Sequence, residues 1–304
     1  MTNHSQFLDR RRFLQASALG VGGLVFGSAL SAAGATPVFD PYERIPLGKT
    51  GLKVSRVCLG TGMRGGQRQS NHTRLGKEKF QALLRAAYDR GVRLFDMADL
   101  YGSHPYLLPA LSGVKREDFT IITKIWWSGG GIPEAERPDA DQVVTRFMKE
   151  IGTDYIDVVL LHCVTSPKWP ENLRKQMDLL ATLKQKKIIR AHGVSVHSLP
   201  ALEAAAAEPW VDSVNARINP FQMSMDGPPD KVVPVLRQLH EAGKGVVGMK
   251  IIGEGRLRND PEKRAESVRY VLNLGCVDVL NVGCESTAEL DDLAELVKRV
   301  PKPA

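Results

Sequence analysis

The chain has 304 residues, of which 43% are hydrophobic and 25% are charged, a composition typical of a globular protein with one large domain or two small ones. Its net charge is +7, but its lysines and arginines form no cluster interleaved with aromatic residues, which argues against nucleic-acid binding. The four cysteines show no CxxC spacing and no CxxCxxC run occurs, so we expect free thiols and no iron–sulfur cluster.

Residues 1–35 have the layout of an export signal. Residues 10–15 read RRRFLQ, which resembles the twin-arginine export motif, and they precede an apolar run that ends in small residues at 33–35. The pattern predicts export by the twin-arginine machinery to the periplasm or another exported location, leaving a mature domain over residues 36–304. The alternative is an uncleaved signal that tethers the protein to a membrane, although residues 16–35 are barely long enough to span a bilayer.

From residue 54 onward, short apolar runs alternate with stretches of helical periodicity. The predicted strands are residues 54–59, 92–95, 119–124, 155–161, 189–194, 211–215, 245–249 and 277–282. The predicted helices are residues 77–90, 139–151, 171–187, 199–207, 230–242, 261–274 and 287–299, with a weaker short helix over 104–111. Eight strand–helix units in about 250 residues predict an α/β fold, the (β/α)₈ or TIM barrel.

The segment ahead of these units reads RIPLGKTGLKVSRVCLG from residue 44. Its two apolar arms flank the turn-forming residues 48–51, which predicts a β-hairpin. We expect this hairpin to plug the floor of the barrel.

A Rossmann sheet is the competing fold, because GTGMRGG contains a G-x-G-x-x-G pattern at Gly60, Gly62 and Gly65 after a strand. A dinucleotide fingerprint opens a helix at once, whereas here the polar stretch GQRQSNHTRL follows. The pattern therefore favours a flexible loop at the mouth of a barrel.

Polar side chains follow three consecutive predicted strands. Asp96, Lys124 and His162 come at the ends of the second, third and fourth strands, and Tyr101 lies just beyond Asp96. Because barrel active sites lie at the carboxyl ends of the strands, we expect all four in one cavity. A nearby ammonium lowers the pKa of a phenol, and a carboxylate holds the ammonium in place. Tyr101 could then protonate a carbonyl oxygen that His162 orients, whereas Asp99 is expected only to cap a turn or helix.

These motifs resemble the aldo-keto reductase family along nearly the whole mature chain. FDMADLYG is similar to the family's F-D-T-A-x-x-Y-G, IITKIW to its lysine strand, DVVLLHCV to its histidine strand, GVSVHS to its G-V-S-N segment and VGCESTAEL to its final cofactor loop. The resemblance implies an NAD(P)H-dependent oxidoreductase that reduces aldehydes or ketones to alcohols, or the reverse. Its catalytic tetrad would be Asp96, Tyr101, Lys124 and His162.

The resemblance also implies where the cofactor binds, and the sequence departs from the family there. The expected cofactor contacts are Ser195, Asn215, Lys250, Gly283, Glu285 and Ser286. The family's Ser-Asn pair is Ser195-Val196 here, Asn215 replaces a glutamine, and Met249-Lys250 replaces the aromatic residue that stacks on nicotinamide.

Glu285 occupies a position where a basic residue often meets the 2′-phosphate of NADPH. A carboxylate there repels a phosphate, so the choice between NADP and NAD is open and NADH becomes more favourable than the family habit suggests. The alternative is that Glu285 points to solvent and that Arg256 or Arg258 holds the phosphate.

Trp126 and Trp127 follow the lysine strand and open a Gly/Pro loop that could lie over the site. Strand alternation turns one toward the cavity, where it would form an apolar wall for a small carbonyl or alcohol substrate. Packing beneath the loop is the alternative. His192 and His197 are five residues apart, which fits no standard metal site, so no metal is expected.

Two hypotheses about function follow. The first is an exported NAD(P)H-dependent carbonyl reductase, which the complete tetrad favours. The second is a nucleotide-binding barrel with little turnover, acting as a sensor or accessory subunit, and the altered nicotinamide contacts leave room for it.

Overall fold

The computed structural model describes residues 36–303. The predicted export signal, residues 1–35, falls outside the described residues. None of the helices described for residues 36–303 combines the length and the apolar character that a membrane span requires.

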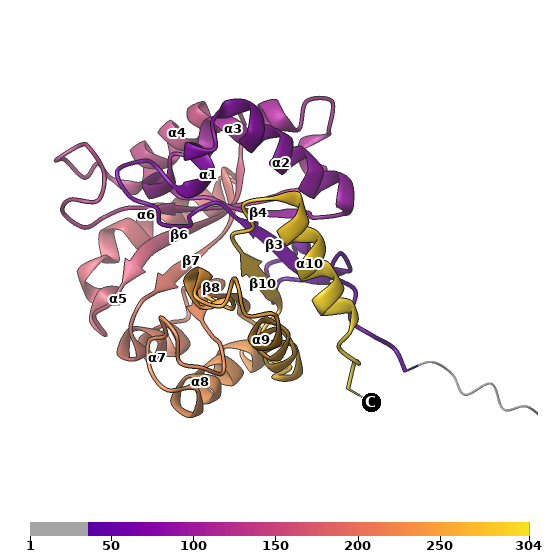
Figure 1. Ribbon diagram of the computed structural model, residues 1–304. Coiled ribbons are helices and arrows are strands. Elements are labelled where there is room, and N and C mark those ends of the chain that lie inside the picture. The colour runs from indigo at the N-terminus through magenta and orange to yellow at the C-terminus, as the bar shows by residue number, and fades with distance from the viewer. Residues whose placement is uncertain (1–35, 304) are drawn as a thin grey trace, which may run out of the picture. The chain divides into compact units, whose positions relative to one another are not determined.

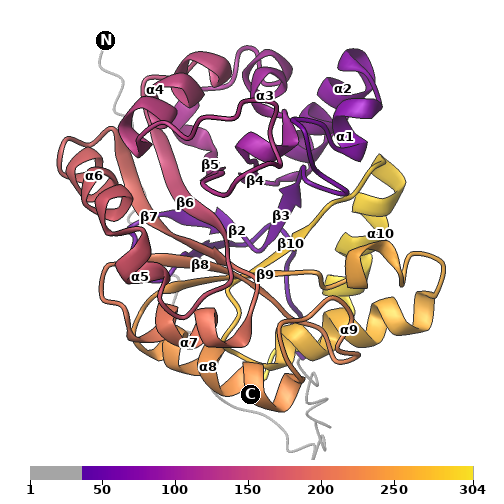
Figure 2. The ribbon, with the colours of Figure 1, turned by 90° about the vertical axis from the view of Figure 1, so that its left-hand side faces the viewer.

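Eight parallel strands close into a barrel, and the helices form a ring around them (Figures 1 and 2). The last strand pairs with the first, which closes the barrel and confirms the predicted (β/α)₈ fold. In chain order the barrel strands are β3 (Val57–Gly60), β4 (Leu94–Asp96), β5 (Thr120–Ile125), β6 (Ile156–Val164), β7 (Ile189–Val196), β8 (Ser213–Arg217), β9 (Gly245–Met249) and β10 (Val279–Val282).

The predicted helices are present, with one correction. The predicted helix over residues 171–187 is two helices, because Leu173 leaves the helical backbone region (φ −111°, ψ 16°) and buries its side chain. The α-helices are α1 (Asn71–Arg74), α2 (Lys77–Arg90), α3 (His104–Ala110), α4 (Ala140–Ile151), α5 (Trp169–Asn172), α6 (Arg174–Gln185), α7 (Leu199–Ala207), α8 (Pro229–Glu241), α9 (Pro261–Asn273) and α10 (Thr287–Lys298). Short 3₁₀ helices are η1 (Asp99–Tyr101), η2 (Arg116–Asp118) and η3 (Gly253–Gly255).

The N-terminal hairpin pairs β1 (Arg44–Pro46) with β2 (Lys53–Ser55) in antiparallel fashion. The predicted strand over residues 54–59 is wrong as a single strand. The chain bends at Arg56, whose backbone N–H donates to Glu43 O (3.2 Å), so Val54 stays in the hairpin and the barrel strand begins at Val57.

The hairpin closes the floor of the barrel, as predicted. Its side chains Leu47, Leu52 and Val54 are buried in one cluster with the inward-facing strand residues, which are Cys58, Leu94, Ile122, Val158, Leu160, Ala191, Val247 and Val279. The turn is anchored at the amino end of β9, where Lys49 N–H donates to Gly243 O (2.7 Å).

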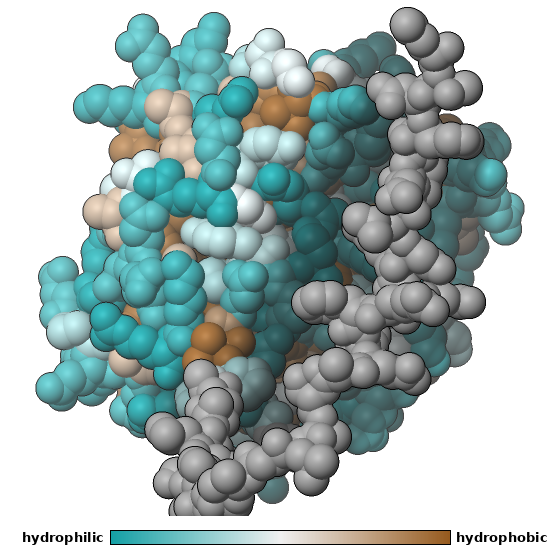
Figure 3. All heavy atoms as spheres, turned by 90° about the vertical axis from the view of Figure 1, so that its right-hand side faces the viewer, coloured by the Kyte–Doolittle hydropathy of each residue, from teal (hydrophilic) through white to brown (hydrophobic). Residues whose placement is uncertain are grey.

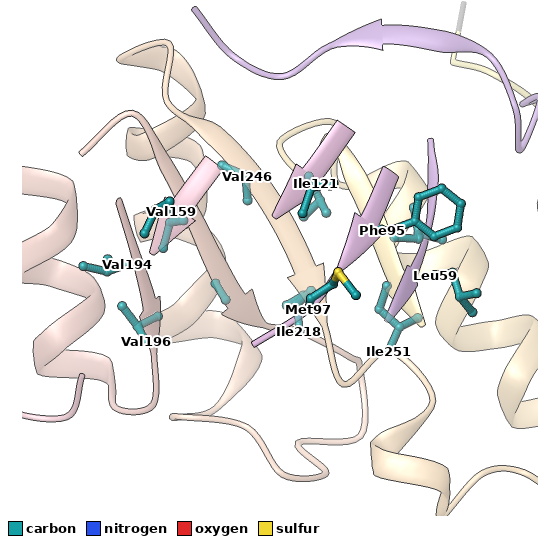
Figure 4. Packing of buried hydrophobic residues seen from close by; sticks show 14 of the residues in the cluster. Leu59, Phe95, Met97, Ile121, Val159, Val194, Val196, Ile218, Val246 and Ile251 are labelled. Carbon is teal, nitrogen blue, oxygen red and sulfur yellow. The ribbon is translucent and has the colours of Figure 1, made fainter. Parts of the chain in front are cut away.

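The alternate residues of the strands form a second, larger apolar cluster with the helices. Leu59, Phe95, Ile121 and Val159 belong to it, and Figure 4 shows their side chains along neighbouring strands. This alternation buries both faces of the sheet, which is why the strands read as continuous apolar runs. The outer surface is mostly hydrophilic on the face shown in Figure 3, and Val38 is the one exposed large hydrophobic residue among residues 36–303.

Candidate active site

The four predicted catalytic residues meet at the carboxyl ends of neighbouring strands. Asp96 ends β4, Lys124 lies in β5, His162 lies in β6, and Tyr101 ends η1 directly beyond β4. Lys124 Nζ donates to Asp96 Oδ1 (2.6 Å) and to the backbone oxygen of Met97 (2.8 Å), and only 1% of the lysine side chain is exposed. The buried ammonium is therefore fixed by a carboxylate, as predicted for this pair.

Asp96 receives further donors that sequence reasoning missed or assigned elsewhere. Asn281, in β10, donates from Nδ2 to Asp96 Oδ2 (2.7 Å), and Asn215 donates from Nδ2 to Asp96 Oδ1 (3.4 Å). Hydrogen bonds to a charged group contribute about 1.5–3 kcal/mol each. The only sequence signal for Asn281 is a polar residue inside an apolar strand.

Tyr101 lies between the histidine, the lysine and a loop. Its hydroxyl is 3.3 Å from His162 Nε2, and Lys124 Nζ lies 4.9 Å from the centroid of its ring. A loop over residues 61–70, the cover loop, packs on this ring, so that a Cβ added at Gly62 would collide with it. The glycine pattern therefore allows close approach to Tyr101 and has no relation to a Rossmann fold.

The pKa values of the site differ from the expectation in one respect. Burial raises the pKa of Tyr101 well above its usual value, and the negative charge of Asp96 raises it further. The expectation of a lowered pKa is therefore not met in this arrangement, because burial and the charge of Asp96 outweigh the ammonium of Lys124, which is itself paired with Asp96. Burial and the charge of Lys124 lower the pKa of His162 well below its usual value. At neutral pH the site therefore holds a protonated phenol beside an uncharged imidazole.

The two tryptophans face different ways, as strand alternation predicts. The Trp126 ring lies edge-on to the His162 ring, with 5.6 Å between centroids. Trp127 Nε1 donates to His162 O (2.6 Å), and its ring packs on the outer core. Trp126 is the one placed beside His162, and its contact with substrate stays a prediction. Trp127 holds the backbone of His162.

Two adjoining hollows extend from Tyr101 across the barrel mouth. The smaller, about 90 Å³, is lined by Asp96, Tyr101, Lys250 and Asn281. The larger, about 510 Å³, ends at the first turn of α10, where Ser286 accepts a hydrogen bond from Glu289 N. They share a wall made of Met63, Ile252, Glu254, Gly255, Val282 and Gly283. A long groove with a helix N-terminus at one end suits an extended cofactor that carries phosphate groups.

A sequence profile of the Aldo/keto reductase family matches residues 56–299. The chain belongs to the aldo/keto reductase family. The chain is 27% identical over 262 residues to the aldo-keto reductase AFTS1 of Alternaria alternata, covering 76% of this chain and 70% of that protein. It is 28% identical over 143 residues to the methylglyoxal reductase DkgB of Salmonella typhimurium, covering 46% of this chain and 51% of that protein.

Solved structures agree on the fold. A putative aldo-keto reductase from Pseudomonas aeruginosa superposes with a TM-score of 0.65 at 25% identity, covering 85% of this chain and 94% of that chain. The holo form of an aldo-keto reductase from Bacillus halodurans gives a TM-score of 0.68 at 20% identity, covering 86% of this chain and 93% of that chain, which shows a common fold. Aldo/keto reductases generally use NAD(P)H, so the fit of that cofactor to this site can be tested.

Two of the polar residues expected at the nicotinamide have surroundings that fit an amide ligand. Ser195 Oγ and Asn215 Oδ1 are buried and have no hydrogen-bond partner within the part of the chain described. Buried polar atoms are rarely left unpaired, and an amide group placed here would satisfy both. Lys250 Nζ is instead paired with Glu254 Oε1 (2.6 Å), at the border between the two hollows.

The larger hollow, where the adenosine half of the cofactor is expected, carries opposed charges. Glu285 does not point freely to solvent, because it accepts hydrogen bonds from Asn71 Nδ2 (2.6 Å) and Arg258 Nη2 (2.9 Å). Burial opposes ionisation, but these donors keep the pKa of Glu285 below its usual value. Arg258 also donates from Nε to Glu289 Oε1 (2.6 Å), while Arg256 lines the same hollow. Because two carboxylates already bind Arg258, its guanidinium is less available to bind the 2′-phosphate of NADPH.

Several polar residues have roles different from their predicted ones or were missed. Asp99 begins η1 without capping it through its side chain, and it binds two arginines instead. Asp226, in the loop after β8, lies beside Arg217 at 3.2 Å and was not predicted. His192 stacks on Trp210 with 4.2 Å between ring centroids, which fits a structural role. Among residues 36–303 no group of three or more metal-binding side chains is present.

Proposed function

We propose that the protein is an NAD(P)H-dependent carbonyl reductase, able to run in reverse as an alcohol dehydrogenase. The observation that carries this proposal is the group of Tyr101, His162, Lys124 and Asp96 at one end of a groove that suits a dinucleotide. Each residue has a contact that matches the role proposed for it.

The bound nicotinamide would supply a hydride to the carbonyl carbon. Tyr101 gives its phenolic proton to the carbonyl oxygen, which completes the alcohol. The neutral imidazole of His162 donates a hydrogen bond to the same oxygen and holds it near the phenol. Lys124 stabilises the resulting phenolate until a proton from solvent restores Tyr101. Ser195 and Asn215 would orient the nicotinamide carboxamide, while Gly283, Glu285 and Ser286 would line the adenosine half.

The cofactor proposed is NADH in preference to NADPH. Glu285 lies in the adenosine half of the groove, is ionised and can accept hydrogen bonds from ribose hydroxyls. Two unit charges about 4 Å apart interact by about 1 kcal/mol in water and by several where the effective dielectric constant is near 20, so a 2′-phosphate would be disfavoured. The ion pair with Arg258 offsets part of this repulsion.

Titration of both nucleotides tests the cofactor proposal. The Glu285→Lys variant should gain at least tenfold in NADPH affinity, about 1.4 kcal/mol. Glu262→Lys makes the same charge change at an exposed site on α9 and serves as the control. The preference for NADH would be excluded if the wild type already bound NADPH more tightly than NADH and Glu285→Lys left both affinities unchanged.

A turnover assay and a binding assay together test the proposed function. Quenching of tryptophan fluorescence reports nucleotide binding, since Trp126 lies beside His162. Oxidation of NADH or NADPH in the presence of a small aldehyde reports chemistry, and methylglyoxal is a suitable first substrate because one relative is named for it. Binding without turnover of any aldehyde or ketone would support the sensor or accessory-subunit hypothesis instead.

The export proposal rests on residues 1–35 alone. Mass spectrometry of the native protein under non-denaturing conditions would report cleavage near Thr36 and any nucleotide that leaves the cell with it. An intact mass that includes residues 1–35 in a cytoplasmic fraction would refute export through the twin-arginine machinery to the periplasm.

A further inference from the structure

Asp99 is a buried carboxylate held by two arginines. Its side chain is 2% exposed. Arg68 Nε donates to its Oδ1 (2.9 Å), and Arg146 Nη2 donates to its Oδ2 (2.7 Å). Since Asp99 and Tyr101 are the first and last residues of η1, any constraint on Asp99 is passed to the backbone of Tyr101.

Arg68 joins three segments around Tyr101. It belongs to the cover loop, its Nε binds Asp99, and its Nη1 donates to Glu134 Oε1 (2.6 Å) in the loop between β5 and α4. The next residue back, Gln67, donates from its backbone to Gly131 O (2.7 Å) in that same loop. The cover loop is therefore fastened on two sides.

The backbone of the cover loop is in an unfavourable conformation. Arg64, Gln67 and Arg68 all have positive φ values of 48°, 54° and 55°. Such conformations of non-glycine residues are unfavourable and persist only where surrounding contacts impose them. Arg68 also lies so close to Gly102 that a Cβ at Gly102 would collide with Arg68 O. The side-chain contacts of Arg68 contribute to this constraint, together with the backbone hydrogen bonds between Gly66 and Gln69.

The contacts continue from Asp99 to the lysine strand. Arg146 Nη1 donates to Glu150 Oε1 (2.7 Å), and Glu150 Oε2 lies 2.7 Å from His104 Nδ1. His104 Nε2 in turn lies within hydrogen-bond distance of Thr123 Oγ1 (2.7 Å), and Thr123 is the residue before Lys124. The turn that carries Tyr101 and the strand that carries Lys124 are thus tied to one network.

We propose that Asp99 and Arg68 are positioning residues, which fix the phenol of Tyr101 at the reaction centre by clamping the cover loop onto its ring. Neither residue lines the two hollows, so the effect acts through Tyr101 and not through cofactor contacts. This inference rests on the proposed function of Tyr101 as proton donor.

The test uses Arg68→Ala, Arg68→Lys and Asp99→Asn in the full chain. Arg85→Ala and Asp89→Asn are matched controls, because Arg85 and Asp89 form an exposed pair of the same kind (2.9 Å) on α2. Hydrogen exchange of residues 62–69 should accelerate at least about tenfold in Arg68→Ala and Asp99→Asn, since the loop then opens independently of global unfolding.

Kinetics separate positioning from a merely structural role. In Arg68→Ala, kcat for carbonyl reduction should fall at least about tenfold while KM for the nucleotide changes less than about threefold. Arg68→Lys keeps the charge but cannot bridge two carboxylates as a guanidinium does, so it should recover part of kcat. Because Arg68 is partly exposed, the arginine variants keep the test available if Asp99→Asn fails to fold.

Two results would overturn the inference. One is unchanged exchange of the cover loop in Arg68→Ala, which would mean that no clamp exists. The other is faster exchange with an unchanged kcat, which would mean that Tyr101 does not depend on the clamp. A wild type that reduces no carbonyl compound would instead refute the proposed function, and the exchange data would still report on the clamp.

Discussion

Two buried carboxylates at the barrel mouth have opposite surroundings. Asp96 is bound by the ammonium of Lys124 (2.6 Å) and by the side-chain amide of Asn281 (2.7 Å). Asp226 lies 3.2 Å from Arg217, but within the described chain neither of its oxygens has a hydrogen-bond partner, although only 1% of its side chain is exposed. Both carboxylates lie next to a cation, but only Asp96 also has hydrogen-bond partners for its oxygens.

The difference separates a completed site from an open one. Burying a charge is costly unless it is both paired and hydrogen-bonded. The surroundings of Asp96 meet both conditions, so this part of the mouth is built before any ligand arrives. The side formed by β7, β8 and the loop after β8 holds buried atoms of Ser195, Asn215 and Asp226 that have no hydrogen-bond partner in the described chain, so a ligand bound there would have polar groups to satisfy.

The largest effect is expected for Lys124→Met. Carbonyl reduction should fall by a factor of about 10²–10⁴ or more, because Tyr101 loses the cation that stabilises its phenolate. The free energy of unfolding should drop by about 3–5 kcal/mol, because Asp96 becomes an uncompensated buried charge. Chemical denaturation measures the loss, and the double variant with Asp96→Asn should recover much of it. A double variant no more stable than Lys124→Met would show that Asp96 does not need its ion pair.

The Asp226→Asn substitution should raise the free energy of unfolding, whereas Lys124→Met should lower it. Burial raises the pKa of Asp226 from 3.8 to about 6, against the charge of Arg217 and Lys250. Because the folded pKa is raised, the folded state holds the proton more tightly, and the resulting stabilisation is complete below pH 3.8 and lost as pH rises through 6. The shift corresponds to about 3 kcal/mol.

The variant should therefore stabilise the protein by up to about 3 kcal/mol at pH 7 and by almost nothing near pH 4. Urea denaturation at the two pH values measures this, with Asp89→Asn on the exposed face of α2 as the control. A variant that is less stable than wild type at pH 7 would show that the ion pair with Arg217 outweighs the burial of Asp226.

The smallest effect is expected for Ser195→Ala. Its buried hydroxyl has no partner among residues 36–303, so stability should be unchanged or slightly higher, while nucleotide affinity should fall by about 0.5–1.5 kcal/mol, roughly two- to tenfold. Ser213→Ala is the matched control, because Ser213 is equally buried but already donates to Gly245 O (3.2 Å). It should lose stability and keep its nucleotide affinity. The reverse result for the two serines would remove Ser195 from the cofactor site.

The ends of the strands could be predicted from the sequence, whereas contacts between distant loops could not. Asp96, Lys124 and His162 lie toward the carboxyl ends of apolar strands, so the barrel geometry alone brings them together. The bend at Arg56 depends on a hydrogen bond to the backbone oxygen of Glu43, and nothing in the apolar run of residues 54–59 indicates it. Asp226 lies in an irregular loop, and Asp99 looks like an ordinary turn residue until Arg68 and Arg146 are seen to converge on it. The pKa of Tyr101 likewise depends on burial, which residue spacing does not specify.

The most direct test of the account is Tyr101→Phe. This change removes only the phenolic proton donor and keeps the ring that packs beneath the cover loop. Carbonyl reduction should fall by a factor of about 10²–10⁴ or more, while nucleotide binding, measured by tryptophan quenching, and thermal stability stay at wild-type values. A Phe variant that retains most of its reductase activity would contradict the central claim that Tyr101 supplies the proton.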